Sequence, residues 1–180
     1  MKNFVNFLTL SRIISGPVIF FAITFSNYYL FGLIIFLLSA VTDFFDGYLA
    51  RKYKKESLLG EVLDPIADKI LLMFLLLSIT LITDDLYVGL MSAIIISREI
   101  FVSGLREFAS KNNISTSTKV TFFAKVKTTL QFITITSYLI SFSIQSSLLL
   151  FISNFLLFLS LLVTFKTGLD YFFNTISKLK

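Results

Sequence analysis

The chain has 180 residues, of which 56% are hydrophobic and 15% are charged, and it contains no histidine and no cysteine. This composition excludes an ordinary soluble domain. The missing residue types exclude imidazole and thiolate catalysis, disulfide bonds and the usual zinc sites. Acid–base chemistry therefore falls to aspartate and glutamate. The net charge of +5 is compatible with binding to nucleic acid, but the positions of the basic residues favour contact with membrane lipid.

The length predicts a single domain, residues 1–180. Its first part, residues 1–12, mixes polar and apolar side chains and is expected to lie along the membrane interface as an amphipathic segment. A cleaved signal peptide is rejected, because the apolar stretch runs past Phe25 without a cleavage-type site.

Six apolar stretches are then interpreted as membrane-spanning helices, since about 20 apolar residues cross a bilayer. They are residues 13–25, 29–49, 65–82, 87–108, 122–141 and 147–165. The first is short unless the amphipathic segment belongs to the same helix, and the last has room to continue toward Tyr171. The predicted fold is all-α: an integral membrane bundle of six transmembrane helices with an N-terminal amphipathic segment.

The basic residues lie on one side of this predicted bundle. The connections near residues 26–27, 83–85 and 143–146 contain no lysine or arginine, whereas the opposite helix ends contain most of them. By the positive-inside rule, both termini and the basic side face the cytoplasm. The chain is therefore predicted to be a multi-pass protein of the cytoplasmic (inner) membrane.

Four aspartates lie on that side within 26 residues: Asp43, Asp46, Asp64 and Asp68. On helices, the first two share a face and so do the last two. Charged carboxylates at a membrane boundary need a partner. Hard divalent cations prefer oxygen ligands and often share them with substrate phosphates, and two such ions can clamp a pyrophosphate. The pattern therefore predicts a divalent-metal site.

Two other interpretations remain open at this point. The acids could form a solvated salt network with nearby basic residues, namely Arg51, Lys52, Lys54, Lys55 and Lys69. Asp64 could also be a helix N-cap, because Asp before Pro65 is typical of a helix start. The small Gly47 and Ala50 favour a site that a phosphate or a flat ring can approach, and the guanidinium of Arg51 suits phosphate.

A second charged group lies in the fourth apolar stretch, where Arg98 and Arg106 are each followed by a glutamate. Charges within a membrane usually face the bundle interior or a cavity, and these two arginines project in similar directions. Together with Lys125 and Lys127, they could bind an anionic substrate. Alternatively, the arginines pair with the neighbouring acids and the lysines only flank the membrane.

The segment from Asp43 to Asp68 resembles the signature of the CDP-alcohol phosphatidyltransferases, Asp-x2-Asp-Gly-x2-Ala-Arg-x8-Gly-x3-Asp-x3-Asp. All eight defining positions match: Asp43, Asp46, Gly47, Ala50, Arg51, Gly60, Asp64 and Asp68. Residues 6–12, the two Arg-Glu pairs and residues 125–131 look like the phosphatidylglycerophosphate synthase branch. Ala124 departs from that branch, which often has glycine there.

The resemblance implies a homodimeric membrane enzyme of phospholipid biosynthesis, with no nucleic-acid partner. It would transfer the phosphatidyl group of CDP-diacylglycerol to glycerol 3-phosphate and release CMP. The four aspartates would bind two divalent ions, Mg²⁺ or Mn²⁺, and Asp68 would also be the general base. The CDP group would be held by Asn6, Thr9, Asp46, Gly47, Ala50, Arg51 and Ser57, and the acceptor phosphate by Arg98, Arg106, Lys125 and Lys127.

Two alternatives to this function are kept. A sister transferase would use serine, inositol phosphate or phosphatidylglycerol as acceptor. An uncharged acceptor, however, would leave four basic residues without a common ligand: Arg98, Arg106, Lys125 and Lys127. A non-catalytic divalent-cation carrier would usually place its site near the bilayer midplane between broken helices. Here Asp46 lies five residues before Arg51, only about 7–8 Å deep at 1.5 Å per residue.

Overall fold

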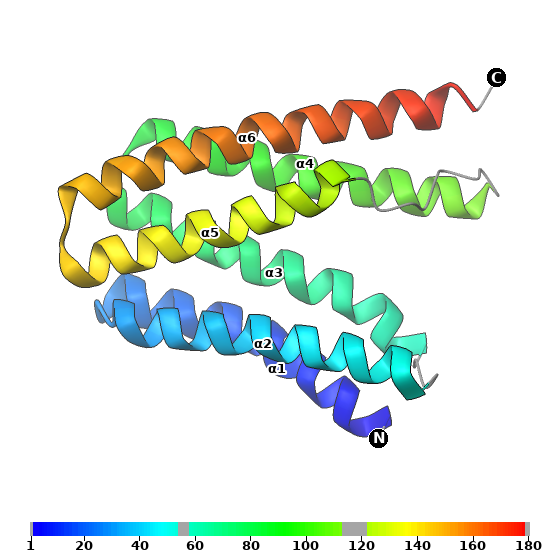
Figure 1. Cartoon of the computed structure of the whole chain (residues 1–180), viewed down its shortest axis with the longest axis horizontal. Helices are drawn as coiled ribbons and strands as arrows, with labels where there is room; N and C mark the ends of the chain where they lie inside the picture. The colour runs from blue at the N-terminus through cyan, green and yellow to red at the C-terminus, as the bar shows by residue number, and fades with distance from the viewer. Residues whose placement is uncertain (1, 54–57, 113–121, 179–180) are drawn as a thin grey trace. The chain divides into compact units, whose positions relative to one another are not determined.

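The computed structural model describes residues 2–53, 58–112 and 122–178, with side chains at 9–43, 63–112 and 125–178. Every regular element in these ranges is an α-helix, which confirms the predicted all-α class (Figure 1). The helices are α1 (Lys2–Phe25), α2 (Tyr29–Tyr53), α3 (Leu58–Thr83), α4 (Leu86–Lys111), α5 (Phe122–Ile144) and α6 (Ser147–Ile176).

Two helix boundaries extend the predicted ones. Helix α1 begins at Lys2, so the amphipathic segment and the first apolar stretch form one continuous helix. Helix α6 continues to Ile176, well past the end of its apolar stretch. In both cases hydropathy marks only the part of a helix that suits a bilayer, and the hydrogen-bonded helix runs on into polar sequence.

One predicted boundary is wrong. Helix α3 begins at Leu58, so Asp64 and Pro65 lie inside it and Asp64 is not its N-cap. A proline within a helix removes a single backbone hydrogen bond. The preceding residues nevertheless remain helical, so the local Asp-Pro signal does not set the start of α3.

Three tight turns join the helices in pairs. Each contains one residue in the left-handed region, Asn27, Asp84 or Gln145, with φ of 56°, 49° and 52°. Asn and Asp tolerate this conformation better than most residues. Next to two of these turns, Asp85 accepts a hydrogen bond from the Tyr87 backbone N–H and caps α4, and Ser146 caps α6. These turns are the same connections that contain no lysine or arginine in the sequence.

The chain divides into two compact units, of which the first comprises residues 1–84 and 139–145. In this unit α1 packs on both α2 and α3 (Figure 1). Ile19 and Ile23 are fully buried on the inner face of α1. Gly16 lets the two backbones approach, since a Cβ there would lie 3.4 Å from the Leu71 Cα on α3. The buried isoleucines and the small Gly16 therefore allow α1 to pack closely on α3.

The second unit comprises residues 85–138 and 146–180. Here α4 packs on α6, and side-chain hydrogen bonds join α5 to α6. The Ser137 and Ser153 hydroxyls are 2.6 Å apart, and the Tyr138 hydroxyl donates to Asn154 Oδ1 at 2.6 Å. Interhelical hydrogen bonds of this kind stabilise helix pairs in an apolar environment.

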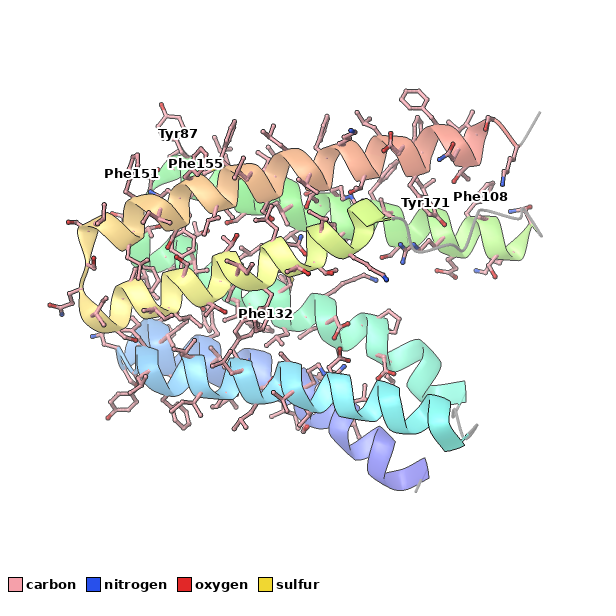
Figure 2. The ribbon with its side chains drawn as sticks, in the orientation of Figure 1. Tyr87, Phe108, Phe132, Phe151, Phe155 and Tyr171 are labelled. Carbon is pink, nitrogen blue, oxygen red and sulfur yellow. The ribbon has the colours of Figure 1, made fainter. Side chains whose placement is uncertain are left out.

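Among the residues that the structure describes with their side chains, three helical segments are long and apolar enough to cross a membrane: Leu63–Thr83, Leu86–Lys111 and Ser147–Ile176. Their outer surfaces are apolar, and Tyr87, Phe151 and Phe155 project outward with 75%, 72% and 56% of their surface exposed (Figure 2). Exposed apolar surface of this extent marks a lipid-facing protein. The chain is therefore an integral membrane protein, and the number of spans stays a prediction.

Candidate active site

A buried arginine of α1 joins two of the predicted metal ligands. Arg12 Nη1 lies 2.9 Å from Asp43 Oδ1 on α2 and 3.2 Å from Asp68 Oδ1 on α3. The Arg12 side chain is only 1% exposed, whereas the two aspartate side chains are 49% and 58% exposed. The arginine therefore lies inside the first unit and presents two carboxylates toward its surface.

The third described aspartate is held by the same helix. Thr9 is fully buried, and its hydroxyl donates a hydrogen bond to Asp64 Oδ1 at 2.7 Å. Thr9 and Arg12 are three residues apart, so they lie on one face of α1. That face continues into the buried Ile19 and Ile23. One face of α1 thus contacts the carboxylates through Thr9 and Arg12, and it contributes Ile19 and Ile23 to the apolar core.

A supporting hydrogen-bond chain fixes this part of α1. The Ser15 hydroxyl donates to the Arg12 carbonyl at 2.7 Å, and the Ser39 hydroxyl of α2 donates to Ser15 Oγ at 3.1 Å. Both serines are buried. The carboxylate site therefore rests on polar contacts among three helices.

The structure brings three of the four predicted metal ligands, Asp43, Asp64 and Asp68, to the same stretch of α1. Within the described side chains, no group of three acidic residues is close enough to hold a metal ion by itself. The side chains of Asn6, Asp46, Gly47, Ala50 and Arg51 lie outside the described set, as does the whole of Ser57.

The donor set nevertheless fits a hard divalent cation. The three aspartates supply only oxygen ligands, which Mg²⁺ and Mn²⁺ prefer, and Asp43 and Asp68 are half exposed. Their described contacts already converge on a cation, the guanidinium of Arg12. The site is therefore organised for positive charge.

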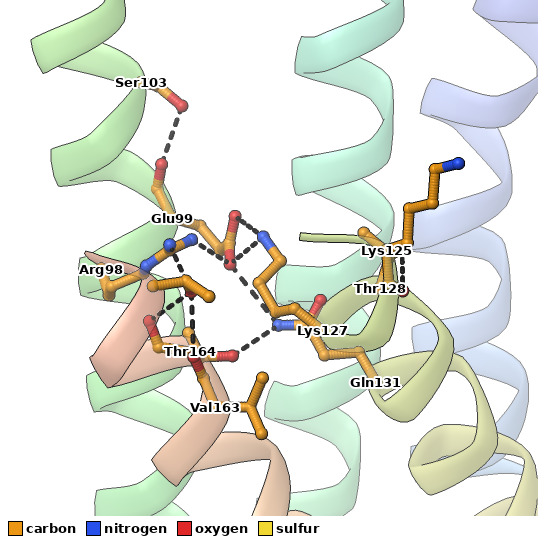
Figure 3. Close-up of polar contacts among 10 residues, drawn as sticks. Arg98, Glu99, Ser103, Lys125, Lys127, Thr128, Gln131, Val163 and Thr164 are labelled. Atoms are coloured by element: carbon orange, nitrogen blue, oxygen red, sulfur yellow. Dashed lines mark hydrogen bonds and ion pairs between the residues drawn. The ribbon is translucent and has the colours of Figure 1, made fainter. Parts of the chain in front are cut away.

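The predicted acceptor residues lie in the second unit, where two of them are engaged in a buried ionic network (Figure 3). Lys127 Nζ donates to both oxygens of Glu99, at 2.7 and 2.9 Å. Arg98 Nη1 donates to Glu99 Oε1 at 3.1 Å. The side chains of all three residues are 11–14% exposed. The alternative prediction that Arg98 pairs with its neighbouring glutamate is confirmed.

The other two predicted acceptor residues are exposed. The Arg106 guanidinium lies over the Tyr171 ring, 5.4 Å from its centroid. Lys125 is also exposed, at the start of the described side chains of α5. Glu107 pairs with Lys111 at 2.7 Å, on the surface of α4. The four predicted cations therefore form a buried pair and an exposed pair.

Several contributors were not assigned a role from the sequence. In the sequence Arg12 stands out only as part of a segment resembling the family, and its bridging position depends on three helices packing together. The sequence suggests Glu99 only as a possible partner of Arg98, whereas in the structure it is the centre of a network. Thr167 and Gly168, which contact Arg98, lie in a part of α6 without a recognisable motif.

The fold and the two sites define a helical membrane protein with several aspartates gathered around Thr9 and Arg12 in one unit and a basic cluster in the other. The family model described as CDP-alcohol phosphatidyltransferase matches residues 2–166. The chain belongs to the CDP-alcohol phosphatidyltransferase family.

Several curated relatives carry the name CDP-diacylglycerol–glycerol-3-phosphate 3-phosphatidyltransferase. The chain is 38% identical to the protein of that name from Rickettsia felis, over 95% of this chain and 94% of the relative. It is 35% identical to the one from Wigglesworthia glossinidia brevipalpis, over 95% and 93%. It is 37% identical to the one from Salmonella choleraesuis, over 73% of each chain.

Proposed function

We propose that this chain transfers the phosphatidyl group of CDP-diacylglycerol to glycerol 3-phosphate, giving phosphatidylglycerophosphate and CMP. The observation that carries the proposal is the likeness to enzymes of that name along almost the whole chain. The two charged sites support it, because the reaction needs a metal-bound pyrophosphate and an acceptor that is itself a phosphate.

Two divalent ions, Mg²⁺ or Mn²⁺, are assigned to Asp43, Asp46, Asp64 and Asp68. When bound, such ions neutralise the pyrophosphate and the charge that develops on the leaving CMP. Thr9 and Arg12 hold three of the carboxylates in place through the contacts described above. The proposed role of Thr9 and Arg12 is to hold the carboxylate ligands close together and in the orientation that binds the metal ions.

Asp68 is also assigned the role of general base. The sn-1 hydroxyl of glycerol 3-phosphate attacks the phosphorus attached to diacylglycerol, the bond from that phosphorus to the CMP oxygen breaks, and the hydroxyl proton passes to Asp68. A base must lie within about 3 Å of the attacking hydroxyl. Asp68 is suited to this because its side chain is 58% exposed and anchored at one oxygen by Arg12.

The CDP group is assigned to residues around the acidic site: Asn6, Thr9, Asp46, Gly47, Ala50, Arg51 and Ser57. Arg51 would pair with a phosphate, and the small Gly47 and Ala50 would let the nucleotide approach the helix. Thr9 would act through Asp64, to which its hydroxyl donates.

The acceptor phosphate is assigned to Arg98, Arg106, Lys125 and Lys127. Arg106 and Lys125 are exposed and available to meet an anion from water. Arg98 and Lys127 carry two positive charges against the single charge of Glu99. The cluster therefore keeps a positive surplus, which favours a phosphate-bearing acceptor over serine.

The proposed setting is the cytoplasmic membrane, with six spans, both termini and the acidic site on the cytoplasmic side, and a homodimeric assembly. The basic residues at one set of helix ends support this orientation. The water-soluble acceptor would then be drawn from the cytoplasm.

The direct test supplies purified protein with CDP-diacylglycerol, Mg²⁺ and one alcohol at a time, and identifies the lipid product by mass. Phosphatidylglycerophosphate should form with glycerol 3-phosphate, together with an equal amount of CMP. A lipid product formed only with serine, inositol phosphate or phosphatidylglycerol would assign the chain to a sister transferase. Metal uptake into vesicles without any lipid product would favour a carrier.

A further inference from the structure

The buried network of the second unit joins three helices through a single carboxylate. Glu99 of α4 accepts hydrogen bonds from Lys127 and Gln131 of α5, and from Arg98 beside it (Figure 3). On its other side, Arg98 Nη2 donates to the Thr167 hydroxyl of α6 at 2.8 Å. The contacts therefore run in series from α6 through Arg98 and Glu99 to the ammonium group of Lys127.

A glycine gives Arg98 the space it needs at the start of this series. A Cβ added at Gly168 of α6 would lie 2.8 Å from Arg98 Nε, 3.1 Å from its Cγ and 3.5 Å from its Cδ. The first distance is shorter than real Cβ atoms show, and Cγ lies near the root of the side chain, where little movement is possible. Any larger residue at position 168 must therefore displace Arg98.

Each nitrogen of the Arg98 guanidinium group lies against the protein. Nη1 faces Glu99 and Nη2 faces Thr167. Nε lies against Gly168 and is buried without a hydrogen-bond partner among the described residues. Arg98 is thus placed to hold Glu99, and its part in the proposed acceptor site is exerted through that carboxylate. A buried, poorly satisfied cation is costly, which indicates that its position serves a purpose beyond packing.

Lys127 lies at the other end of the series and still has bonding capacity. A lysine ammonium has three donors, and the described contacts use it toward one carboxylate, at 2.7 and 2.9 Å. Its four-carbon side chain is flexible, and about 2 kcal/mol of rotamer entropy opposes fixing it in one place. Contact with Glu99 fixes the ammonium before a ligand arrives, which lowers the cost of binding.

We propose that Gly168 and Glu99 are positioning residues for the acceptor phosphate: Gly168 admits Arg98, Arg98 holds Glu99, and Glu99 holds Lys127 where it meets the phosphate. This inference rests on the proposed function for the nature of the acceptor. Neither residue touches the phosphate itself, so both act through Lys127. The effect of either on the acceptor should disappear when Lys127 is absent.

The test compares Gly168→Ala with a matched glycine of the same unit, Gly104 of α4, where an added Cβ meets nothing within 4 Å. Alanine favours a helix over glycine at both positions by about 1 kcal/mol. Neither variant should unfold at a lower temperature through loss of helix. Initial rates are measured against glycerol 3-phosphate at saturating CDP-diacylglycerol, and then against CDP-diacylglycerol.

We expect Lys127→Gln to raise KM for glycerol 3-phosphate roughly 10-fold or more, because one charge-assisted contact is lost. Gly168→Ala should raise the same KM by less, about 3- to 10-fold, because it only displaces Lys127. Its kcat and its KM for CDP-diacylglycerol should stay near wild type, and Gly104→Ala should match wild type throughout. Gly168→Ala combined with Lys127→Gln should bind the acceptor no more weakly than Lys127→Gln alone. Additive losses, or equal behaviour of the two glycine variants, would overturn the proposal.

Glu99→Gln gives a second route that adds no bulk at position 168. It keeps the length of the side chain but removes the charge that holds Lys127, and it should also raise KM for glycerol 3-phosphate. A fall in that KM would overturn the proposal, because it would show that Glu99 competes with the phosphate for Lys127.

Failure of the proposed function is recognised separately. The lipid made by the wild-type protein is identified by mass, and the upward shift of Tm caused by glycerol 3-phosphate is measured without turnover. If the wild-type product contains another acceptor, the proposed function fails. A normal Tm shift in Gly168→Ala, equal to that of Gly104→Ala, overturns the positioning role whatever the product is.

Discussion

Replacing Arg12 by glutamine should destabilise the metal-free protein much more than the metal-bound protein. Arg12 Nη1 contacts Asp43 and Asp68 at 2.9 and 3.2 Å, so those two carboxylate oxygens are no more than about 6 Å apart. Without the guanidinium, nothing among the described contacts offsets their repulsion. A bound divalent cation would offset it.

The magnitude follows from these distances and from the exposure of the two acids. Repulsion between unit charges about 6 Å apart is about 0.7 kcal/mol in water and about 2.8 kcal/mol at an effective dielectric constant of 20. Because Asp43 and Asp68 are half exposed, the lost attraction is worth about 1 kcal/mol for each. The free energy of unfolding should fall by about 2–4 kcal/mol, or by roughly 4–16 °C in Tm for a chain of this length.

The assay is thermal unfolding in detergent with excess chelator and again with saturating Mg²⁺. Lys69→Gln is the matched control, since it removes one positive charge from the next residue after Asp68 and has no described contact with the carboxylates. The Tm deficit of Arg12→Gln should shrink to a small fraction in Mg²⁺, while Lys69→Gln behaves like wild type in both. An equal deficit with and without Mg²⁺ would refute the reasoning and leave Arg12 a packing role alone.

Three other results are expected. Excess chelator should abolish CMP release and added Mg²⁺ or Mn²⁺ should restore it, so full activity in chelator would disprove metal dependence. Asp68→Asn should lower kcat by roughly 10² or more while CDP-diacylglycerol still binds with metal, and near-normal turnover of this variant would disprove the role of Asp68 as base. Asp43→Asn should instead weaken the binding of metal and of CDP-diacylglycerol together. Cysteines introduced at Lys111 and Asp84 of this cysteine-free chain should react with impermeant reagents from opposite sides of the membrane, and reaction from the same side would contradict the predicted topology.

Much of the helical framework could be predicted because it depends on local properties of the chain. Long apolar stretches give the helices, and polar residues without lysine or arginine mark the turns at Asn27, Asp84 and Gln145. Boundaries were harder. The Asp64-Pro65 pair is a strong local signal for a helix start, yet α3 begins at Leu58.

The candidate site could be predicted only as far as it depends on sequence spacing. Spacing puts Asp64 and Asp68 on one face of a helix, and it relates Asp43 to Asp46 in the same way. It does not reveal that Arg12 of another helix contacts two of these carboxylates, since that depends on how α1, α2 and α3 pack. Likewise, Gly168 gains its meaning only when α6 lies against Arg98 of α4.

The described contacts of the two sites leave residual charges of opposite sign, and this favours a functional arrangement over a purely structural one. In the first unit the Arg12 guanidinium contacts the carboxylates of Asp43 and Asp68, and Asp64 beside them accepts from the neutral Thr9 hydroxyl, so these described contacts leave a negative surplus. Two cations face the single carboxylate of Glu99 in the second unit, which leaves a positive surplus. A salt network that served only stability would be expected to neutralise itself, because unbalanced charge in an apolar environment is costly. Each surplus is opposite to the charge that the proposed reaction brings to it, a divalent cation at the first site and a phosphate at the second.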